Sequence, residues 1–268
     1  MNDSSEIIGI LGGMGPAATA DFYAKLVSVT PAETDQEHPR TVIWSDPTVP
    51  DRTEALLRQG PDPTPWLIRG SEILRAAGAT LIAIPCNTAH AFVPTISEHV
   101  DLPVVHMIDE VARHLTAIRP RIRVAGLLAT SGTLRAGLYQ EWLDRANITL
   151  VVPDETTQNT EVMPAIRALK AGVRGEAASQ PLARAAHRLI EQGAQAIIAG
   201  CTELPLGLRP ASLPVPLVDP TLVLARAVLE RSRTTPVGSE MSPMYCMQYV
   251  TDAGSTSSPE RRGLPTPS

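Results

Sequence analysis

The chain has 268 residues and a formal net charge of −5, which allows two domains of about 110 residues and gives no sign of the basic face that binds nucleic acid. No apolar run approaches the roughly 20 residues of a membrane span, so we expect no membrane contact. The first residues lack the charged and apolar regions of a signal peptide; with three cysteines, this favours a cytoplasmic protein whose thiols stay free.

Strands and helices alternate along the first half, a pattern typical of parallel sheets. Apolar runs predict strands at Ile7–Leu11, at Thr41–Ser45, before Cys86 and at Pro103–His106. Helices are expected over 17–29, 66–77, 88–99 and 108–118. The Pro-rich stretch 46–53 is predicted to be a loop at the carboxyl end of the second strand.

The second half repeats this alternation. It predicts strands at Val124–Leu128, at Thr149–Val152, before Cys201 and at Val215–Val218. It predicts helices over 134–146, 160–171, 177–192 and 220–233. The segment 234–268 is rich in Ser, Thr, Pro and Gly without sustained periodicity, which predicts a disordered tail.

Each half carries a cysteine in a similar setting. Gly78–Cys86 has the sequence GATLIAIPC and Gly193–Cys201 has GAQAIIAGC, so a Gly-Ala pair opens both segments and a cysteine closes them. The Gly-rich stretch 9–15 recurs at 126–132 with nearly the same spacing. These recurrences favour two similar α/β halves. Because parallel sheets bind ligands at the carboxyl ends of their strands, we expect both thiols to face one cleft.

Two thiols at helix starts can exchange protons with a substrate. Helix N-termini lower the pKa of thiols and present free N–H groups to anions. A thiolate on one face of a carbon atom could remove a proton while a thiol on the opposite face returns one, which inverts the centre. A disulfide between Cys86 and Cys201 is an alternative, weakened by the expected reducing compartment. A metal site with Cys86 and His90 lacks two further ligands at a convincing spacing, and His90 is predicted to be a packing residue.

Five motifs together resemble those of the aspartate/glutamate racemase family, on its aspartate racemase branch. They are Gly12–Pro16 (GGMGP), Pro50–Thr53 (PDRT), Pro85–His90 (PCNTAH), Lys170–Gly172 (KAG) and Gly200–Pro205 (GCTELP). The resemblance covers about residues 6 to 232 and implies racemisation of an amino acid by two cysteines, with no cofactor and no metal. Glutamate racemases carry a His two residues after the second cysteine. This chain has Glu203 there, which favours aspartate over glutamate or a broader set of amino acids.

The resemblance also implies roles for single residues. Cys86 and Cys201 would be catalytic, and Arg52 and Lys170 would bind the side-chain carboxylate of the substrate. Other residues beside the cysteines and the Gly-rich turns complete the predicted substrate site: Met14, Asn87, Thr88, Thr130, Thr133, Thr202 and Glu203. For Asn87 and the threonines, helix capping or turn hydrogen bonding is an alternative that is compatible with ligand binding.

The predicted fold is α/β, with two pseudo-symmetric three-layer domains that contain parallel sheets and an active site in the cleft between them. The resemblance implies that the last helix returns to the first domain. We therefore expect an N-terminal domain of residues 1–108 plus 219–233, a C-terminal domain of residues 109–218 and the tail 234–268. An amino acid is the expected small-molecule partner, and a homodimer the expected assembly.

Three other functions remain open from the residues alone. Gly13–Ala18 (GMGPAA) matches the dinucleotide fingerprint of an NAD-dependent dehydrogenase, although Glu33 lies in a predicted loop and not at the end of a second strand. A non-catalytic binding module for acidic amino acids would also use two closing halves, but the two cysteines argue against it. A pyridoxal phosphate enzyme needs a Schiff-base lysine, for which Lys170 is the candidate.

Overall fold

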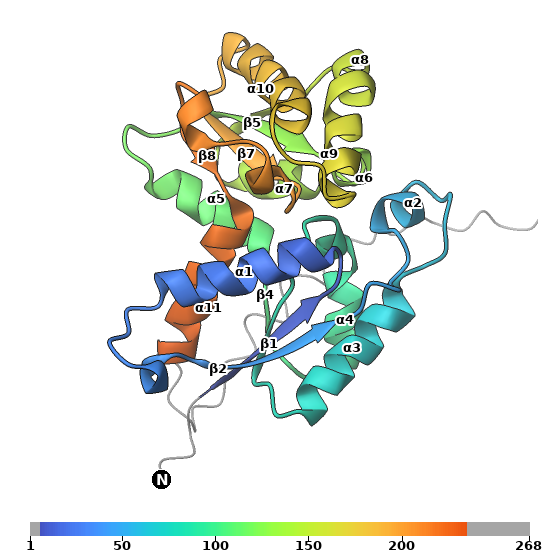
Figure 1. Cartoon of the computed structure of the whole chain (residues 1–268), viewed down its shortest axis with the longest axis vertical. Helices are drawn as coiled ribbons and strands as arrows, with labels where there is room; N and C mark the ends of the chain where they lie inside the picture. The colour runs from blue at the N-terminus through green and yellow to red at the C-terminus, as the bar shows by residue number, and fades with distance from the viewer. Residues whose placement is uncertain (1–5, 235–268) are drawn as a thin grey trace, which may run out of the picture. The chain divides into compact units, whose positions relative to one another are not determined.

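The structure of the chain is a computed structural model, and it describes residues 6–234 (Figure 1). Two four-stranded sheets form the framework of this part of the chain, and all their strand pairs are parallel. The α/β class and the parallel sheets are therefore confirmed. The prediction of a disordered tail falls outside the described residues from residue 235 on.

The first sheet has the strand order β2-β1-β3-β4. Its strands are β1 (Ile7–Gly12), β2 (Arg40–Ser45), β3 (Leu81–Ala83) and β4 (Val104–Val105). The helical segments along this half are α1 (Pro16–Val29), η1 (Asp35–Glu37), α2 (Arg52–Leu56), α3 (Thr64–Ala76), η2 (Thr88–Phe92), α4 (Val93–His99) and α5 (Met107–Ala117).

Side chains of β1 alternate between two buried faces, as the period of a strand requires. Ile8 and Ile10 belong to an apolar cluster with Phe22 of α1. Leu11 belongs to a second cluster, with Leu67 of α3. The first sheet is therefore the middle of three layers, which explains why its central strands are apolar without interruption.

The second sheet has the strand order β6-β5-β7-β8. Its strands are β5 (Val124–Ala129), β6 (Thr149–Val151), β7 (Ala196–Gly200) and β8 (Leu217–Val218). The helical segments are α6 (Ser131–Arg135), α7 (Leu138–Arg145), α8 (Glu155–Thr157), the π-helical turn η3 (Gln158–Val162), α9 (Met163–Lys170), α10 (Glu176–Glu191), η4 (Leu204–Leu206), η5 (Pro210–Ser212) and α11 (Pro220–Thr234).

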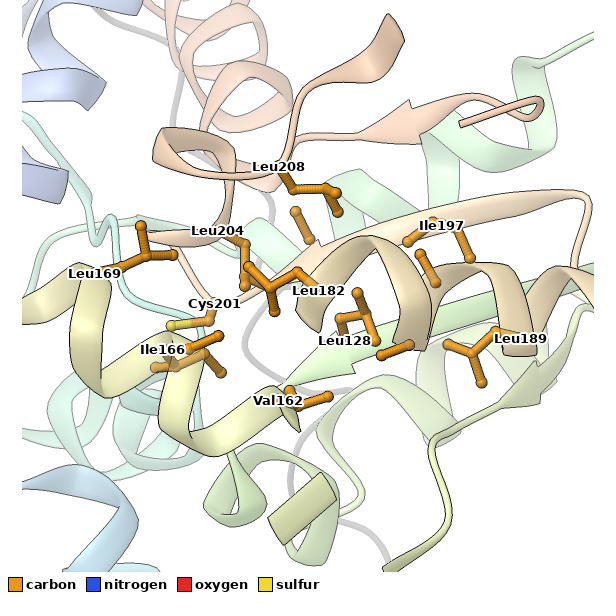
Figure 2. Packing of buried hydrophobic residues seen from close by; sticks show 14 of the residues in the cluster. Leu128, Val162, Ile166, Leu169, Leu182, Leu189, Ile197, Cys201, Leu204 and Leu208 are labelled. Atoms are coloured by element: carbon orange, nitrogen blue, oxygen red, sulfur yellow. The ribbon is translucent and has the colours of Figure 1, made fainter. Parts of the chain in front are cut away.

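The second sheet also packs helices on both faces. Leu128 and Ile197 face α9 and α10, whose Ile166 and Leu182 complete one apolar cluster (Figure 2). The other face belongs to a cluster that contains residues of α5 and α7. Cys201 is part of the first of these clusters, so its thiol is anchored in the core of the second half (Figure 2).

The two sheets have the same topology, since β1, β2, β3 and β4 take the places of β5, β6, β7 and β8. Cys86 follows β3 and Cys201 follows β7, so the two cysteines occupy equivalent places, as the sequence repeat predicts. After β8 the chain returns to the first sheet. Leu224 and Val228 of α11 share a cluster with Ile8, and α11 packs beside α1 (Figure 1).

Several predicted boundaries are wrong for local reasons. The expected loop 46–53 ends in α2, because Asp51 accepts hydrogen bonds from the amides of Thr53 and Glu54 and so caps a helix too short to show periodicity. The expected helix 134–146 is two helices, divided at Gly137, whose φ is 62°. Pro94 and Pro164 lack an N–H donor, and each lies in the first turn of an α-helix, so η2 and η3 precede α4 and α9.

The helices within residues 6–234 are all too short or too polar to cross a membrane.

Candidate active site

A pocket lies at the carboxyl ends of strands from both sheets. Every residue of the predicted site lines it except Thr133. The lining residues are Met14, Asp51, Arg52, Thr53, Cys86, Asn87, Thr88, Thr130, Lys170, Cys201, Thr202 and Glu203. Residues that follow β1 and β3 of the first sheet and β5 and β7 of the second therefore line one pocket, and within each sheet they lie where neighbouring parallel strands end.

Both cysteines of the pocket are free thiols. Cys86 is 6% exposed and Cys201 is 5% exposed, and neither forms a disulfide. The alternative of a disulfide between them is therefore wrong for this structure. Within residues 6–234, no group of three or more His, Cys, Asp or Glu residues is arranged to hold a metal ion.

The thiol of Cys201 faces a carboxylate. Its Sγ donates a hydrogen bond of 3.0 Å to Oε2 of Glu203, and the hydroxyl of Thr202 donates to the same oxygen at 3.3 Å. The amide of Gly15, in the turn after β1, donates to Oε1 of Glu203 at 3.3 Å. Burial raises the pKa of the Cys201 thiol, and the negative charge of Glu203 adds to this rise against the opposing effect of Lys170.

The backbone of Cys86 is held by His90. Nδ1 of His90 lies 2.9 Å from the carbonyl oxygen of Cys86, and the amide of Met107 donates to Nε2 at 3.0 Å. His90 is therefore a neutral imidazole that donates through Nδ1–H. Burial lowers its pKa to about 4 and that of His106, whose ring centroid lies 4.8 Å away, to about 2. With both nitrogens occupied, His90 is a packing residue and not a free base.

Two cationic side chains line the pocket. The Arg52 guanidinium is 8% exposed and donates to the carbonyl oxygens of Val49 (3.0 Å), Pro50 (2.8 Å) and Met14 (3.3 Å). Lys170 ends α9, and although the residue as a whole is exposed, it lines the pocket and its ammonium group is partly shielded from water there. Burial of its ammonium group lowers the pKa, but the negative charges of Glu203, Cys201 and Cys86 outweigh this effect and raise it overall. Both side chains are thus positioned to attract a carboxylate.

Asn87 presents a donor that the rest of the described chain does not use. Its Oδ1 accepts a hydrogen bond from the hydroxyl of Tyr139, whereas its buried Nδ2 has no partner among residues 6–234. Buried amides are normally hydrogen-bonded, so an orphaned donor in a pocket wall indicates a ligand position.

Three threonine hydroxyls form a cluster beside Asn87. Oγ1 of Thr88 lies 2.9 Å from Oγ1 of Thr133 and 3.2 Å from Oγ1 of Thr130. Oγ1 of Thr130 also accepts a hydrogen bond from the amide of Thr133 and so caps α6, as expected if the threonines cap helices. Thr133 is not among the residues that line the pocket and contacts Thr88, which is; its contact with the substrate stays a prediction.

Sequence reasoning missed three residues of this site. Asp51 and Thr53 line the pocket from α2, and the motif Pro50–Thr53 was the available signal. Tyr139 reaches Asn87 from α7, and nothing in the local sequence indicates this contact. A Cβ atom on Gly132 would lie 2.7 Å from the Cα of Thr53, so glycine permits the close approach of α6 and α2 at the pocket.

Two four-stranded parallel sheets that share one pocket with two free thiols define a class of α/β enzyme in which each half supplies one cysteine. The chain belongs to the Asp/Glu/hydantoin racemase family, whose model matches residues 11–228. It is therefore an enzyme of an amino-acid racemase family, and the dehydrogenase and binding-module hypotheses are set aside.

Individual relatives differ in substrate. The chain is 28% identical over 227 residues to the broad specificity amino-acid racemase RacX of Bacillus subtilis (strain 168), covering 83% of this chain and 96% of RacX. It is similar to the structure of Picrophilus torridus aspartate racemase, with 30% identity, a TM-score of 0.72 and coverage of 90% of this chain and 97% of that one. It is 31% identical over 145 residues to the glutamate racemase of Deinococcus radiodurans, covering 50% and 45% of the two chains.

Proposed function

We propose that this protein interconverts the L and D forms of an acidic amino acid, with aspartate preferred, and that it needs no cofactor. The observation that carries the proposal is the pair of buried free thiols, Cys86 and Cys201, in one pocket that also contains Arg52 and Lys170. Thiols on two sides of a pocket suit removal of a proton from one face of a carbon atom and its return to the other.

In one direction the thiolate of Cys201 takes the α-proton and becomes a thiol. The thiol of Cys86 then gives its proton to the opposite face of the resulting carbanion and becomes a thiolate. In the other direction the two cysteines exchange roles. The α-proton is a very weak acid, so the carbanion must be stabilised by fixed donors in a site that excludes water. Asn87 Nδ2 is the donor that we assign to the α-carboxylate and its developing charge, and the hydroxyl of Thr202 would join it by turning from Glu203 to the substrate.

The proposed substrate preference rests on charge. An acidic side chain would place a second carboxylate near Arg52 and Lys170, and a neutral side chain would lack this attraction. Met14, Thr88 and Thr130 would shape the remaining wall. The similarity to the aspartate racemase of Picrophilus torridus supports aspartate. A broad specificity is the second candidate, supported by the coverage of RacX along nearly its whole length.

We also propose the domain division, the assembly and the location that the sequence suggests. The domains would be residues 1–108 with 219–233, and residues 109–218. The clustering of Leu224 and Val228 with Ile8 supports the return of the last helix to the first domain. A homodimer in the cytoplasm is the expected form, and light scattering on the purified protein measures its mass directly.

The function is tested by incubating the protein with a panel of single L-amino acids and no cofactor, followed by chiral chromatography. Aspartate should give the D form most rapidly. In deuterated water the product should gain deuterium while recovered substrate stays largely protiated at early times, because each thiol serves one face. A single flexible base would label both. Wild-type racemase activity in either Cys86→Ala or Cys201→Ala would disprove the two-thiol mechanism.

A further inference from the structure

Glu203 occupies a special place among the wall residues. Its carboxylate is only 2% exposed, and its oxygens accept hydrogen bonds from the Cys201 thiol, the Thr202 hydroxyl and the Gly15 amide. A buried carboxylate of this kind would repel a substrate carboxylate. Its orientation towards Sγ of Cys201, at 3.0 Å, points to a role in the chemistry of that thiol.

The equivalent place in the first half is different. Two residues after Cys201 the chain has Glu203, whereas two residues after Cys86 it has Thr88. The hydroxyl of Thr88 forms hydrogen bonds with the hydroxyls of Thr130 and Thr133. The two cysteines are thus equivalent in topology, but only Cys201 has an adjacent carboxylate hydrogen-bonded to its thiol within the described chain.

We propose that Glu203 is the proton acceptor of Cys201, so that the two halves of the pocket form their thiolates by different routes. This inference rests on the proposed function. It changes the assignment of Glu203 from a ligand of the substrate to a positioning residue that acts through Cys201. The Gly15 amide supports this role because it holds the second carboxylate oxygen and so fixes the first against the thiol.

The proton transfers balance as follows. Before the reaction, the Cys201 thiol gives its proton to the Glu203 carboxylate, which leaves a thiolate and a carboxylic acid. The thiolate takes the α-proton and becomes a thiol again, and Cys86 gives its proton to the opposite face. Glu203 then loses its proton to water, and the Cys86 thiolate gains one from water. In the reverse direction Cys86 abstracts, and the thiol of Cys201, hydrogen-bonded to Glu203, is the donor.

The test must separate the two thiols, because racemisation uses both in each turnover. The enantiomers of 3-chloroaspartate allow this, since removal of the α-proton expels chloride and forms an enamine that hydrolyses to oxaloacetate and ammonia. That reaction needs one base only. In Cys86→Ala, elimination depends on Cys201 and should consume one enantiomer; in Cys201→Ala it depends on Cys86 and should consume the other.

Glu203→Gln is then added to each single-thiol variant, since glutamine keeps the shape and an acceptor for the Gly15 amide but cannot take a proton from a thiol. Elimination through Cys201 should fall by about 10²-fold or more, the usual contribution of a positioned proton acceptor. Elimination through Cys86 should fall far less. Glu203→Asp, which retains a carboxylate, should restore part of the Cys201 reaction.

The pH profile gives a second readout that a structural role would not change. The charged or titratable groups that act on Cys201 are Glu203, Lys170 and Tyr139. With glutamine at 203 the thiol must lose its proton to solvent. In the glutamine variant the rate of elimination through Cys201 should therefore recover as pH rises. The Cys86→Ala protein that keeps Glu203 should reach its maximal rate at lower pH.

Equal losses through both thiols would overturn the inference, because a ligand of the substrate ammonium or a structural residue affects both enantiomers alike. Absence of elimination in both single-thiol variants with wild-type melting temperatures would instead disprove the proposed function. If the glutamine variant does not fold, Glu203→Asp provides the same comparison. Its shorter side chain withdraws the carboxylate from Sγ, so a selective loss through Cys201 is again required.

Discussion

The hydroxyl of Tyr139 donates a hydrogen bond to Oδ1 of Asn87, and this contact joins α7 to the residue that follows Cys86. Burial raises the pKa of Tyr139, so the phenol keeps its proton and remains a donor. With Oδ1 occupied, the amide group of Asn87 is fixed in one orientation. Its Nδ2 is then available to a ligand, which gives the pocket a donor prepared before binding.

Tyr139→Phe should therefore weaken both folding and substrate binding. It leaves Oδ1 of Asn87 buried without its donor, which costs about 1–3 kcal/mol of unfolding free energy. The freed amide can also rotate, so KM should rise. Urea unfolding and steady-state kinetics measure the two effects. Tyr23→Phe is the matched control, because Tyr23 is exposed on α1 and should change neither. Equal behaviour of the two variants would show that the Tyr139 contact is dispensable.

Removing the Arg52 guanidinium should change substrate selectivity. Truncating one partner of a buried charge pair costs about 2–5 kcal/mol, so Arg52→Ala should lower kcat/KM for aspartate far more than for alanine. The variant also loses three bonds to backbone carbonyls, so some loss with both substrates is expected. The ratio of the two kcat/KM values is the measurement, and an unchanged ratio would remove Arg52 from the substrate site.

Lys170→Gln should change the ratio of kcat/KM for aspartate to that for alanine by a smaller factor than Arg52→Ala, because the residue is more exposed than Arg52 and water screens its charge more. Arg167→Gln is the matched control. It removes a cation of the same sign from an exposed position of α9 that does not line the pocket. If both substitutions have the same effect on the ratio, the charge of Lys170 acts only through the overall field of the protein.

Gly132→Ala should disturb the contact between α6 and α2. Its Cβ would lie 2.7 Å from the Cα of Thr53, so one helix must shift, at a cost of about 1–3 kcal/mol. Because α2 carries Arg52, kcat/KM should fall as well. Gly137→Ala is a useful contrast, since its added Cβ meets nothing within 4 Å and only its φ of 62° is strained. That variant should lose stability and retain kcat/KM; a parallel loss of activity would argue against the helix contact as the cause.

Stability should decrease in mild acid because of His90. Burial lowers its pKa to about 4 from the ordinary 6.5, so the unfolded chain takes up a proton before the native protein does. The unfolding free energy should be retained above pH 6.5 and fall towards pH 4, by on the order of 3 kcal/mol for this group. Burial also lowers the pKa of His106, so its contribution to the unfolding free energy is likewise lost as the pH falls, over a range that extends to lower pH.

Urea unfolding at several pH values measures this dependence. His90→Gln removes the titrating ring, so the variant should be less stable near neutral pH but show a flatter slope in mild acid. The slope that remains belongs to His106 and to carboxylates. An identical slope in the wild-type protein and the variant would mean that His90 is not the group responsible.

The sequence by itself determined the alternation of strands and helices along the chain and the place of each cysteine at the end of a strand. Apolar runs that end at Cys86 and Cys201 predict buried strands, because a strand covered on both faces is apolar throughout. The repeat of the two halves, each with a cysteine at the carboxyl end of a strand, predicts that both thiols share a cleft, and the family motif adds Arg52 to that site. Short elements such as α2 escaped prediction, since five residues carry no measurable period.

Only the tertiary structure decided which side chains act on one another. Glu203 accepts a hydrogen bond from the amide of Gly15, which is 188 residues away in the sequence. Asn87 accepts one from the hydroxyl of Tyr139, which is 52 residues away. The same residue types would be compatible with substrate contacts, caps or surface positions. Packing of the helices against each sheet fixes their directions, because buried polar groups must find partners wherever the close-packed core places them. The repeat spacing predicted the two cysteines of the pocket, the family motifs predicted most of its other members, and packing determined their partners.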